Sequence, residues 1–285
     1  MRHNRAPITF GSRSDGHGNR SINVMNIDPL HQSVLRVARR AGAAILDVYQ
    51  SDDFGVEAKA DESPLTIADL AAHNVIASML KSITPDIPVV SEEDEASLVH
   101  RTPEGEFWLI DPLDGTKEFV ARNGEFTVNI ALIRDGRTVW GVVYAPVRDL
   151  LYWGGFGLGA WVNESGTTRP IACVGPVAGE PFKVVASKSH LNERTQQWIQ
   201  QLGDAFFVQA GSSLKLCHVA SGEAHVYPRL APTCEWDTAA AQAVVEGAGG
   251  WVTDLMGNQV RYGKPEILNP DFTVSAVHPS KLPRV

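Results

Sequence analysis

The segment WLIDPLDGTKEF, residues 108–119, constrains the fold of this chain more than any other segment. An apolar run that begins at Phe107 predicts a buried strand, and this run ends abruptly at Asp111. Asp114 follows three residues later, and Gly115 then allows the backbone to approach closely as a helix begins. The sequence therefore predicts two carboxylates at the end of one buried strand.

Carboxylates in this position can bind divalent cations, because hard cations prefer oxygen ligands. The backbone N–H groups of a helix that begins there can also contact a phosphate. A structural interpretation stays open, in which the segment is an ordinary turn and Asp114 caps the helix. Two distant acidic residues favour the metal site: Glu92 follows a short predicted strand, and Asp237 lies at the start of a predicted helix. Asp237 can also be interpreted as a helix cap.

Apolar residues recur with helical spacing in two N-terminal segments, and strand patterns follow them. The elements predicted in this half are helices over 29–49 and 66–80 and strands over 88–90, 107–110, 126–133, 138–145 and 150–153. Beyond a stretch rich in Gly and Pro over 164–181, strands and helices alternate. These are strands over 182–186, 205–209, 224–227 and 272–277 and helices over 191–202, 213–221 and 238–248.

This pattern predicts an α/β protein with an α+β N-terminal half, built as a layered sandwich. We expect a disordered tail over 1–25, which is rich in Gly, Ser, Arg and Asn. A subdomain over 26–175 would carry most of the metal ligands. A second subdomain over 176–285 would complete the site and bind the substrate.

Composition narrows the functional classes. The chain has 25 basic and 33 acidic residues and a formal net charge of −8, which argues against a nucleic-acid-binding protein. Its three cysteines form neither a disulfide framework nor a zinc-ribbon pattern. No apolar run approaches the roughly 18 residues of a membrane span. These features favour a small-molecule partner and do not predict the oligomeric state.

Four short motifs together resemble the inositol monophosphatase superfamily. They are SEED at 91–94, WLIDPLDGTKEF at 108–119, GSSLK at 211–215 and EWDTAA at 235–240. They occur in the order and spacing of that superfamily, and the resemblance runs from about Leu30 to Pro279. It implies a layered αβαβα sandwich of the inositol monophosphatase and sugar phosphatase type. It also implies a phosphatase whose cofactor is Mg²⁺, with two or three ions per site.

The resemblance implies a role for each matching residue. Metal ligands would be the side chains of Glu92, Asp111, Asp114 and Asp237 and the backbone carbonyl of Leu113. Asp69 and Thr116 would form a hydrogen bond and together orient and deprotonate the attacking water. One departure is Ala241, where similar proteins often have Gly, and this small exchange leaves the ligand set intact.

Basic residues near these motifs suit a second phosphate group on the substrate, although each could equally be an exposed, solubilising residue. The predicted substrate contacts are Glu92, Leu113, Asp114, Gly115, Thr116, Lys117, Ser212, Ser213, Lys215, Arg229 and Asp237. With the resemblance, they favour adenosine 3′,5′-bisphosphate as substrate, hydrolysed to AMP and phosphate as in the bacterial bisphosphate nucleotidases. The sulfated nucleotide 3′-phosphoadenylyl sulfate could also be accepted.

Two alternatives remain at this point. The chain could be an inositol monophosphatase or another sugar phosphatase. It could also be a cation-binding module without catalysis, although Asp69 and Thr116 argue against this, since metal binding alone does not need them. The resemblance further implies a role in sulfate assimilation, inhibition by lithium and a cytoplasmic location, with peripheral association at the inner membrane in some similar proteins.

Overall fold

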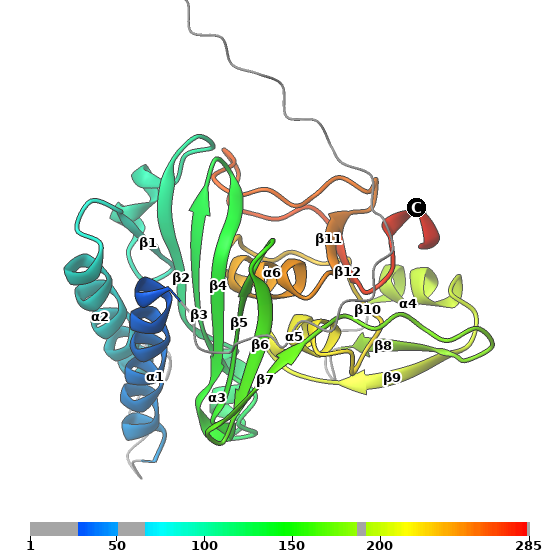
Figure 1. Cartoon of the computed structure of the whole chain (residues 1–285), viewed down its shortest axis with the longest axis horizontal. Coiled ribbons are helices and arrows are strands. Elements are labelled where there is room, and N and C mark those ends of the chain that lie inside the picture. Colours follow the sequence, from blue (N-terminus) through cyan, green and yellow to red (C-terminus); the bar gives the residue numbers. More distant parts are fainter. Residues whose placement is uncertain (1–27, 51–65, 187–191, 284–285) are drawn as a thin grey trace, which may run out of the picture.

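The computed structural model describes residues 28–50, 66–186 and 192–283, so the tail predicted over 1–25 lies outside the described residues. Within those ranges the chain forms five layers, in the order helices, sheet, helices, sheet, helix (Figure 1). This arrangement confirms the predicted αβαβα sandwich. No helix of the described ranges is both long and apolar enough to cross a membrane.

The first layer consists of α1 (Pro29–Tyr49) and α2 (Thr66–Ile83), which pack against each other and against the first sheet. The side chain of Asp28 caps α1 by accepting a hydrogen bond of 2.8 Å from the Leu30 N–H. Pro29 occupies the first helical turn, where its missing N–H has no cost. An apolar stripe on α1 is buried, so this helix covers one face of the sheet as its sequence period predicts.

The first sheet has seven strands in sequence order, and only β1 runs parallel to its neighbour. Its strands are β1 (Val89–Ser91), β2 (Glu106–Asp114), β3 (Thr127–Arg134), β4 (Arg137–Ala145), β5 (Leu150–Gly155), β6 (Gly159–Glu164) and β7 (Thr167–Ile171). The short helix α3 (Thr116–Val120) follows β2 directly. Strand β2 therefore delivers the residues around Asp111 to a position between β1 and β3.

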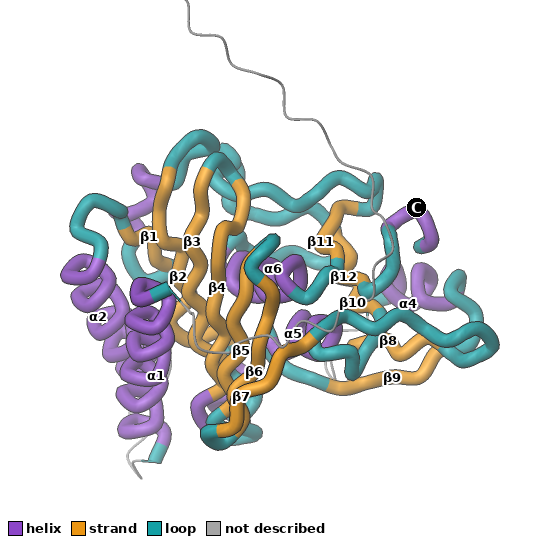
Figure 2. Tube along the Cα trace, viewed as in Figure 1, coloured by secondary structure: helices purple, strands orange, loops and turns teal. Residues whose placement is uncertain are grey.

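The central layer consists of α5 (Leu214–Ala220) and α6 (Trp236–Gly247), and Figure 2 shows both helices between the two sheets. Helix α6 lies very close to β4. A Cβ added at Gly141 would come within 2.4 Å of the Ala240 carbonyl oxygen, so only glycine fits at this position of the strand. Ala241 is fully buried in the same helix. Small side chains on α6 thus allow it to lie flat on the first sheet.

The second sheet has five strands in the order β11-β12-β10-β8-β9. Its strands are β8 (Phe182–Ala186), β9 (Ala205–Gln209), β10 (Val226–Arg229), β11 (Trp251–Asp254) and β12 (Phe272–Ser275). Strands β8, β9 and β10 are parallel, and β12 runs antiparallel to its two neighbours. Helix α4 (Glu193–Gln200) covers the outer face, where Trp198 packs with Val184 and Val226.

Three strands of the structure were not predicted, and β2 continues to Asp114, whereas the sequence predicted a strand over 107–110. The stretch 164–181, predicted to be a boundary, contains β7, and neither β6 nor β11 was predicted. Strand β7 has exposed polar residues and Pro170 at the edge of its sheet, so it lacks the alternation that marks a half-buried strand. Helix α6 comes from the second predicted subdomain but packs on the first sheet. The division into 26–175 and 176–285 stays a prediction.

Candidate active site

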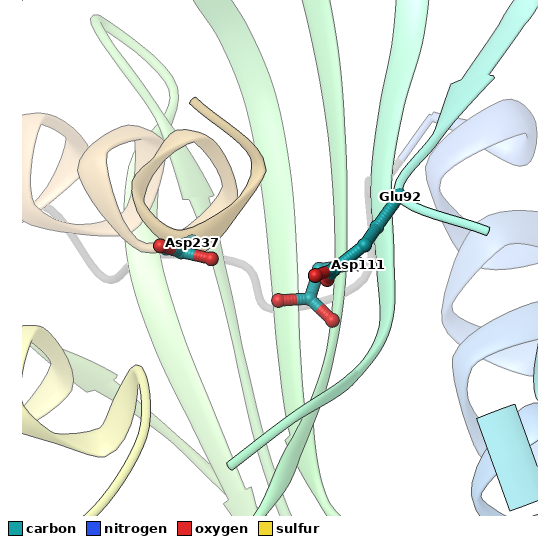
Figure 3. A group of neighbouring side chains, drawn as sticks. All are labelled: Glu92, Asp111 and Asp237. Carbon is teal, nitrogen blue, oxygen red and sulfur yellow. The ribbon is translucent and has the colours of Figure 1, made fainter. Parts of the chain in front are cut away.

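Three acidic side chains from distant parts of the sequence converge in the fold (Figure 3). Glu92 directly follows β1, Asp111 lies in β2 and Asp237 lies in the first turn of α6. One carboxylate oxygen from each of the three lies within 4.8 Å of the other two. Such spacing allows all three carboxylates to contact one cation. Their role as metal ligands stays a prediction.

Local backbone geometry explains why Glu92 and Asp111 face the same space. Ser91 pairs with Ile110 in the parallel β1–β2 ladder, and the Glu92 N–H donates to the Ile110 carbonyl at 3.3 Å. The β2–β3 register shifts between Asp111 and Asp114, next to a proline that has no N–H for the ladder. The end of β2 is therefore irregular between the two aspartates, although both still pair with β3.

Gly115 ends this segment with φ +99°, a left-handed conformation that favours glycine. A Cβ at this position would lie 3.2 Å from the Ser212 Cβ and 3.3 Å from the Phe126 Cα. Glycine thus permits both the sharp turn into α3 and the close approach of the chain before α5. This confirms the conformational role that the sequence predicted for Gly115.

Asp114 lies beside the three-carboxylate group but outside it, and its contacts explain its orientation. Its Oδ2 accepts hydrogen bonds from Ser212 Oγ at 2.6 Å, Ser213 Oγ at 2.8 Å and Asn129 Nδ2 at 3.4 Å. The two serines were predicted to be substrate contacts, and the structure places their hydroxyls on this carboxylate. Asn129 was not predicted as a site residue. Its only signal was a buried polar residue within the apolar strand TVNIALIR.

The turn before α6 holds Asp237 in place. The Cys234 N–H donates to Asp237 Oδ2 at 2.7 Å, and Asn269 Nδ2 donates to the Cys234 carbonyl at 2.7 Å. Glu235 is fully buried and accepts hydrogen bonds from the N–H groups of Gly263 and Lys264 at 2.9 Å and 3.1 Å. Backbone and side-chain contacts therefore fix this carboxylate on one side of the site.

Burial and mutual repulsion raise the pKa values of the clustered carboxyls. Burial, followed by the charges of Glu92 and Asp114, raises the pKa of Asp111 well above its usual range. Partial burial, followed by the charges of Asp237 and Asp114, raises the pKa of Glu92 to about 7. Burial, followed by the charge of Asp114, likewise raises the pKa of Asp237 to about 7. A group of carboxyls this basic attracts cations as well as protons.

The residues present fit a hard divalent cation. Asp111 is 1% exposed, and its Oδ1 is a buried oxygen without a hydrogen-bond partner in the described part of the chain. A buried acceptor normally has a partner, because an unsatisfied one costs free energy. An Mg²⁺ ion between three carboxylates would provide that partner and relieve their repulsion.

The predicted catalytic pair, Asp69 and Thr116, lies on α2 and α3. Asp69 is 2% exposed on α2, and burial, followed by the charges of Glu93 and Glu92, raises its pKa to about 8. It therefore lies near the acidic turn after β1. Thr116 begins α3, and the hydrogen bonds among the described residues do not include one between Asp69 and Thr116. The role of this pair stays a prediction.

One pocket adjoins the acidic residues on the side of the second sheet. It is lined by Asp114, Ser212, Lys215, Leu216, Tyr227, Arg229, Thr233, Asp237, Thr238 and Phe272. Two predicted basic residues, Lys215 and Arg229, therefore share a cavity with Asp237, and their charges oppose the rise in its pKa. Lys117 is exposed on α3 and does not line this pocket. Tyr227 and Phe272 were not predicted, because their place at the site depends on how the second sheet packs.

Comparisons with known proteins find relatives over most of this chain. The model of the inositol monophosphatase family matches residues 26–281. The 3′(2′),5′-bisphosphate nucleotidase CysQ of Escherichia coli strain K12 is 48% identical over 244 residues, which cover 85% of this chain and 98% of that protein. The 3′(2′),5′-bisphosphate nucleotidase CysQ of Haemophilus influenzae is 31% identical over 248 residues, which cover 86% of this chain and 92% of that protein.

Solved structures of two proteins also match most of this chain. The crystal structure of CysQ from Bacteroides thetaiotaomicron matches with a TM-score of 0.78 and 39% identity, over 88% of this chain and 98% of that one. Inositol monophosphatase-II from Staphylococcus aureus matches with a TM-score of 0.72 and 19% identity, over 88% of this chain and 90% of that one. At that identity, the second match shows a shared fold alone.

Proposed function

Because the chain belongs to the inositol monophosphatase family, we propose that it is a magnesium-dependent 3′(2′),5′-bisphosphate nucleotidase. It would hydrolyse the 3′-phosphate of adenosine 3′,5′-bisphosphate to give AMP and phosphate. The observation that carries this proposal is the group of three carboxylates beside a pocket with two basic residues. The relatives that are 48% identical over nearly their whole length carry the name of this activity.

The metal site would use Glu92, Asp111, Asp114 and Asp237, together with the backbone carbonyl of Leu113. When bound, Mg²⁺ lowers the pKa of a water molecule and stabilises negative charge on phosphate oxygens. Four carboxylates carry a formal charge of −4, so two divalent ions neutralise them and three make the site positive. We infer two or three ions per site, because a phosphate dianion must enter a site that no longer repels it.

Asp69 and Thr116 would position the attacking water and accept its proton. The pKa of Asp69 is raised to about 8, so its ionised side chain is a stronger base than an ordinary carboxylate. Thr116 lies at the start of α3, five residues after Asp111 in the chain. Its hydroxyl would donate to or accept from the same water. Their joint role would be orientation and proton transfer, without a covalent phosphoenzyme.

The second phosphate of the nucleotide would bind to Lys215 and Arg229. Both residues line the pocket that Asp114 and Asp237 also line, so a substrate there would have one phosphate near the carboxylates and another near the basic pair. Arg229 offers a planar donor fork that suits a phosphate. The segment of Gly115, Thr116 and Lys117 would contact the scissile phosphate. The sulfated nucleotide 3′-phosphoadenylyl sulfate would fit the same pattern, in line with a role in sulfate assimilation.

Phosphate release distinguishes this function from that of an inositol monophosphatase. We expect kcat/KM for adenosine 3′,5′-bisphosphate to exceed that for inositol 1-phosphate by about tenfold or more. One hydrogen bond between charged groups contributes about 1.5–3 kcal/mol, and each 1.4 kcal/mol corresponds to about tenfold. Activity should disappear with EDTA and return with Mg²⁺. An equal or greater rate with inositol 1-phosphate would favour the sugar phosphatase. The absence of phosphate release from every bisphosphate tested would favour a cation-binding module.

A further inference from the structure

We propose that Asn129, Ser212 and Ser213 are positioning residues, which hold Asp114 in the orientation that binds metal. The two serines then act on the carboxylate and do not contact the substrate. This inference rests on the proposed function, because it takes Asp114 to be a metal ligand. It changes the role predicted for Ser212 and Ser213 from their sequence motif alone.

The three donors all approach one oxygen of the same carboxylate. Ser212, Ser213 and Asn129 donate to Asp114 Oδ2 at 2.6, 2.8 and 3.4 Å. None of the hydrogen bonds among the described residues reaches Asp114 Oδ1. Since all three donors bind one oxygen, they hold that oxygen in place and leave the other oxygen for a cation. Such outer contacts commonly orient metal ligands in proteins.

The hydroxyl protons of both serines are already used within the protein. Ser212 has one proton, which Asp114 accepts, and the Ser212 oxygen lies 2.5 Å from the Thr127 hydroxyl. Ser213 can give its single proton to Asp114 at 2.8 Å or to the Asp237 carbonyl at 2.9 Å. Its oxygen also accepts from Asn129 at 2.9 Å.

A phosphate oxygen accepts hydrogen bonds and therefore needs a free donor. Ser212 and Ser213 are 6% and 1% exposed, so little of either side chain is accessible, although Ser212 forms part of the pocket lining. Either serine could donate to a phosphate only by withdrawing its proton from Asp114 or from the Asp237 carbonyl. The geometry therefore favours the carboxylate over the substrate as the partner of both residues.

The same contacts join the two walls of the site. Asp114 and Asn129 belong to strands of the first sheet, whereas the serines precede α5 in the central helical layer. Ser213 lies within 2.9 Å of the Asp237 carbonyl, so it links Asp114 with the helix that carries Asp237. Ser212 has φ +50°, a left-handed conformation that costs a non-glycine residue free energy. The network thus sets how far apart Asp114 and Asp237 are held.

The test compares Ser213→Ala with a matched control, Ser275→Ala. Both serines are 1% exposed, and each lies 2.9 Å from a backbone carbonyl, of Asp237 and of Val277 respectively. Ser275 lies in β12 and does not contact a carboxylate of the site. Loss of stability from deleting a buried hydroxyl should therefore be similar in the two variants, and only Ser213→Ala should change the metal site.

Three quantities are measured: Mg²⁺ affinity by calorimetry, the shift in Tm that Mg²⁺ causes, and KM for adenosine 3′,5′-bisphosphate at saturating Mg²⁺. For Ser213→Ala we expect Mg²⁺ affinity to fall by about 10–100-fold, as for other residues that orient metal ligands. The Mg²⁺-induced shift in Tm should shrink accordingly, and KM should stay close to the wild-type value. Ser275→Ala should lower Tm and keep both the wild-type Mg²⁺ affinity and the wild-type shift.

Unchanged Mg²⁺ affinity in Ser213→Ala, with an increased KM, would overturn the inference and return the serines to the substrate. Ser212→Ala, which removes the donor at 2.6 Å, gives the same test if Ser213→Ala does not unfold cooperatively. Wild-type protein that takes up no Mg²⁺ would overturn the proposed function as well. If wild-type protein and Ser213→Ala bind Mg²⁺ with the same affinity, only the positioning role is overturned and the proposed function stands.

Discussion

Replacing Asp237 by Asn should stabilise the metal-free protein at alkaline pH and weaken its stabilisation by Mg²⁺. Asp237 lies in the first turn of α6, close to the carboxylates of Glu92 and Asp111. Asparagine has nearly the same shape, and its side-chain oxygen can still accept the Cys234 N–H that now donates at 2.7 Å. The substitution therefore removes one negative charge from the group and leaves the turn intact.

The size of the effect follows from the pKa of Asp237, which burial and then Asp114 raise from 3.8 to about 7. Its pKa is higher in the folded state than in the unfolded state, so ionisation destabilises the fold as pH rises from about 4 to about 7. At 1.36 kcal/mol per pKa unit, the loss above pH 7 is about 4 kcal/mol. Asparagine does not ionise and so avoids this loss of stability. It also lacks the favourable interaction of a negative charge with the start of α6, which contributes roughly 0.5 kcal/mol.

Without metal we therefore expect Asp237→Asn to have the higher free energy of unfolding, by roughly 3–4 kcal/mol at pH 8 and by only about 1 kcal/mol at pH 5. Mg²⁺ should favour the wild-type protein over the variant. At a free concentration of 100 times its Kd, Mg²⁺ stabilises wild-type protein by about 2.7 kcal/mol, whereas a variant with a damaged site gains much less. The advantage of the variant should therefore shrink when Mg²⁺ is added.

Urea denaturation followed by tryptophan fluorescence measures these differences, since the chain has seven tryptophans. Each protein is unfolded at pH 5 and pH 8, with EDTA and with Mg²⁺. Asp254→Asn is the matched control, because Asp254 also accepts backbone N–H groups in a turn and is not part of the carboxylate group. If Asp237→Asn showed the wild-type pH dependence in EDTA, or kept the full stabilisation by Mg²⁺, the reasoning about repulsion within the site would be refuted.

Three further substitutions test other parts of the site. Thr116→Ala should lower kcat by about 100-fold or more while calorimetry still detects normal Mg²⁺ uptake; an unchanged kcat would exclude Thr116 from water activation. Arg229→Gln should raise KM for adenosine 3′,5′-bisphosphate by roughly 10–100-fold, the effect of one charged hydrogen bond, in phosphate-release assays. A similar rise for substrates with a single phosphate would contradict its role at the second phosphate. Glu235→Ala should lower the free energy of unfolding by about 3–5 kcal/mol, because Arg101, 3.2 Å away, would lose its buried partner; a loss below 1 kcal/mol in urea denaturation would disprove this.

Much of the fold could be predicted from sequence because its signals are local. The predicted helix over 29–49 has the bounds of α1, since a cap, a proline and an apolar stripe define it within one segment. Strand β8 likewise has the predicted bounds 182–186. Strands β7 and β11 could not be predicted in this way. Both are short strands at the edges of sheets, where pairing with a neighbour, and not an apolar pattern, decides the conformation.

The acidic residues of the site were predictable for a similar reason. Glu92, Asp111 and Asp237 each follow or begin a recognisable element, and their motifs match a known family, so their convergence could be expected. The partners of Ser212 and Ser213 could not be predicted. The direction of a hydroxyl depends on which acceptor the fold brings near it, and Asp114 lies about a hundred residues away in the chain.

The same electrostatics explain how an acidic protein can act on an anionic substrate. Without metal, Glu92 and Asp237 have pKa values of about 7, so protons partly neutralise the site near neutral pH. Mg²⁺ must displace these protons, and its affinity should therefore rise as pH increases through about 7. The substrate meets a site whose repulsion has been removed, with Lys215 and Arg229 already beside it. Metal uptake should accordingly precede tight binding of the nucleotide, because a bisphosphate that arrived first would face uncompensated carboxylates.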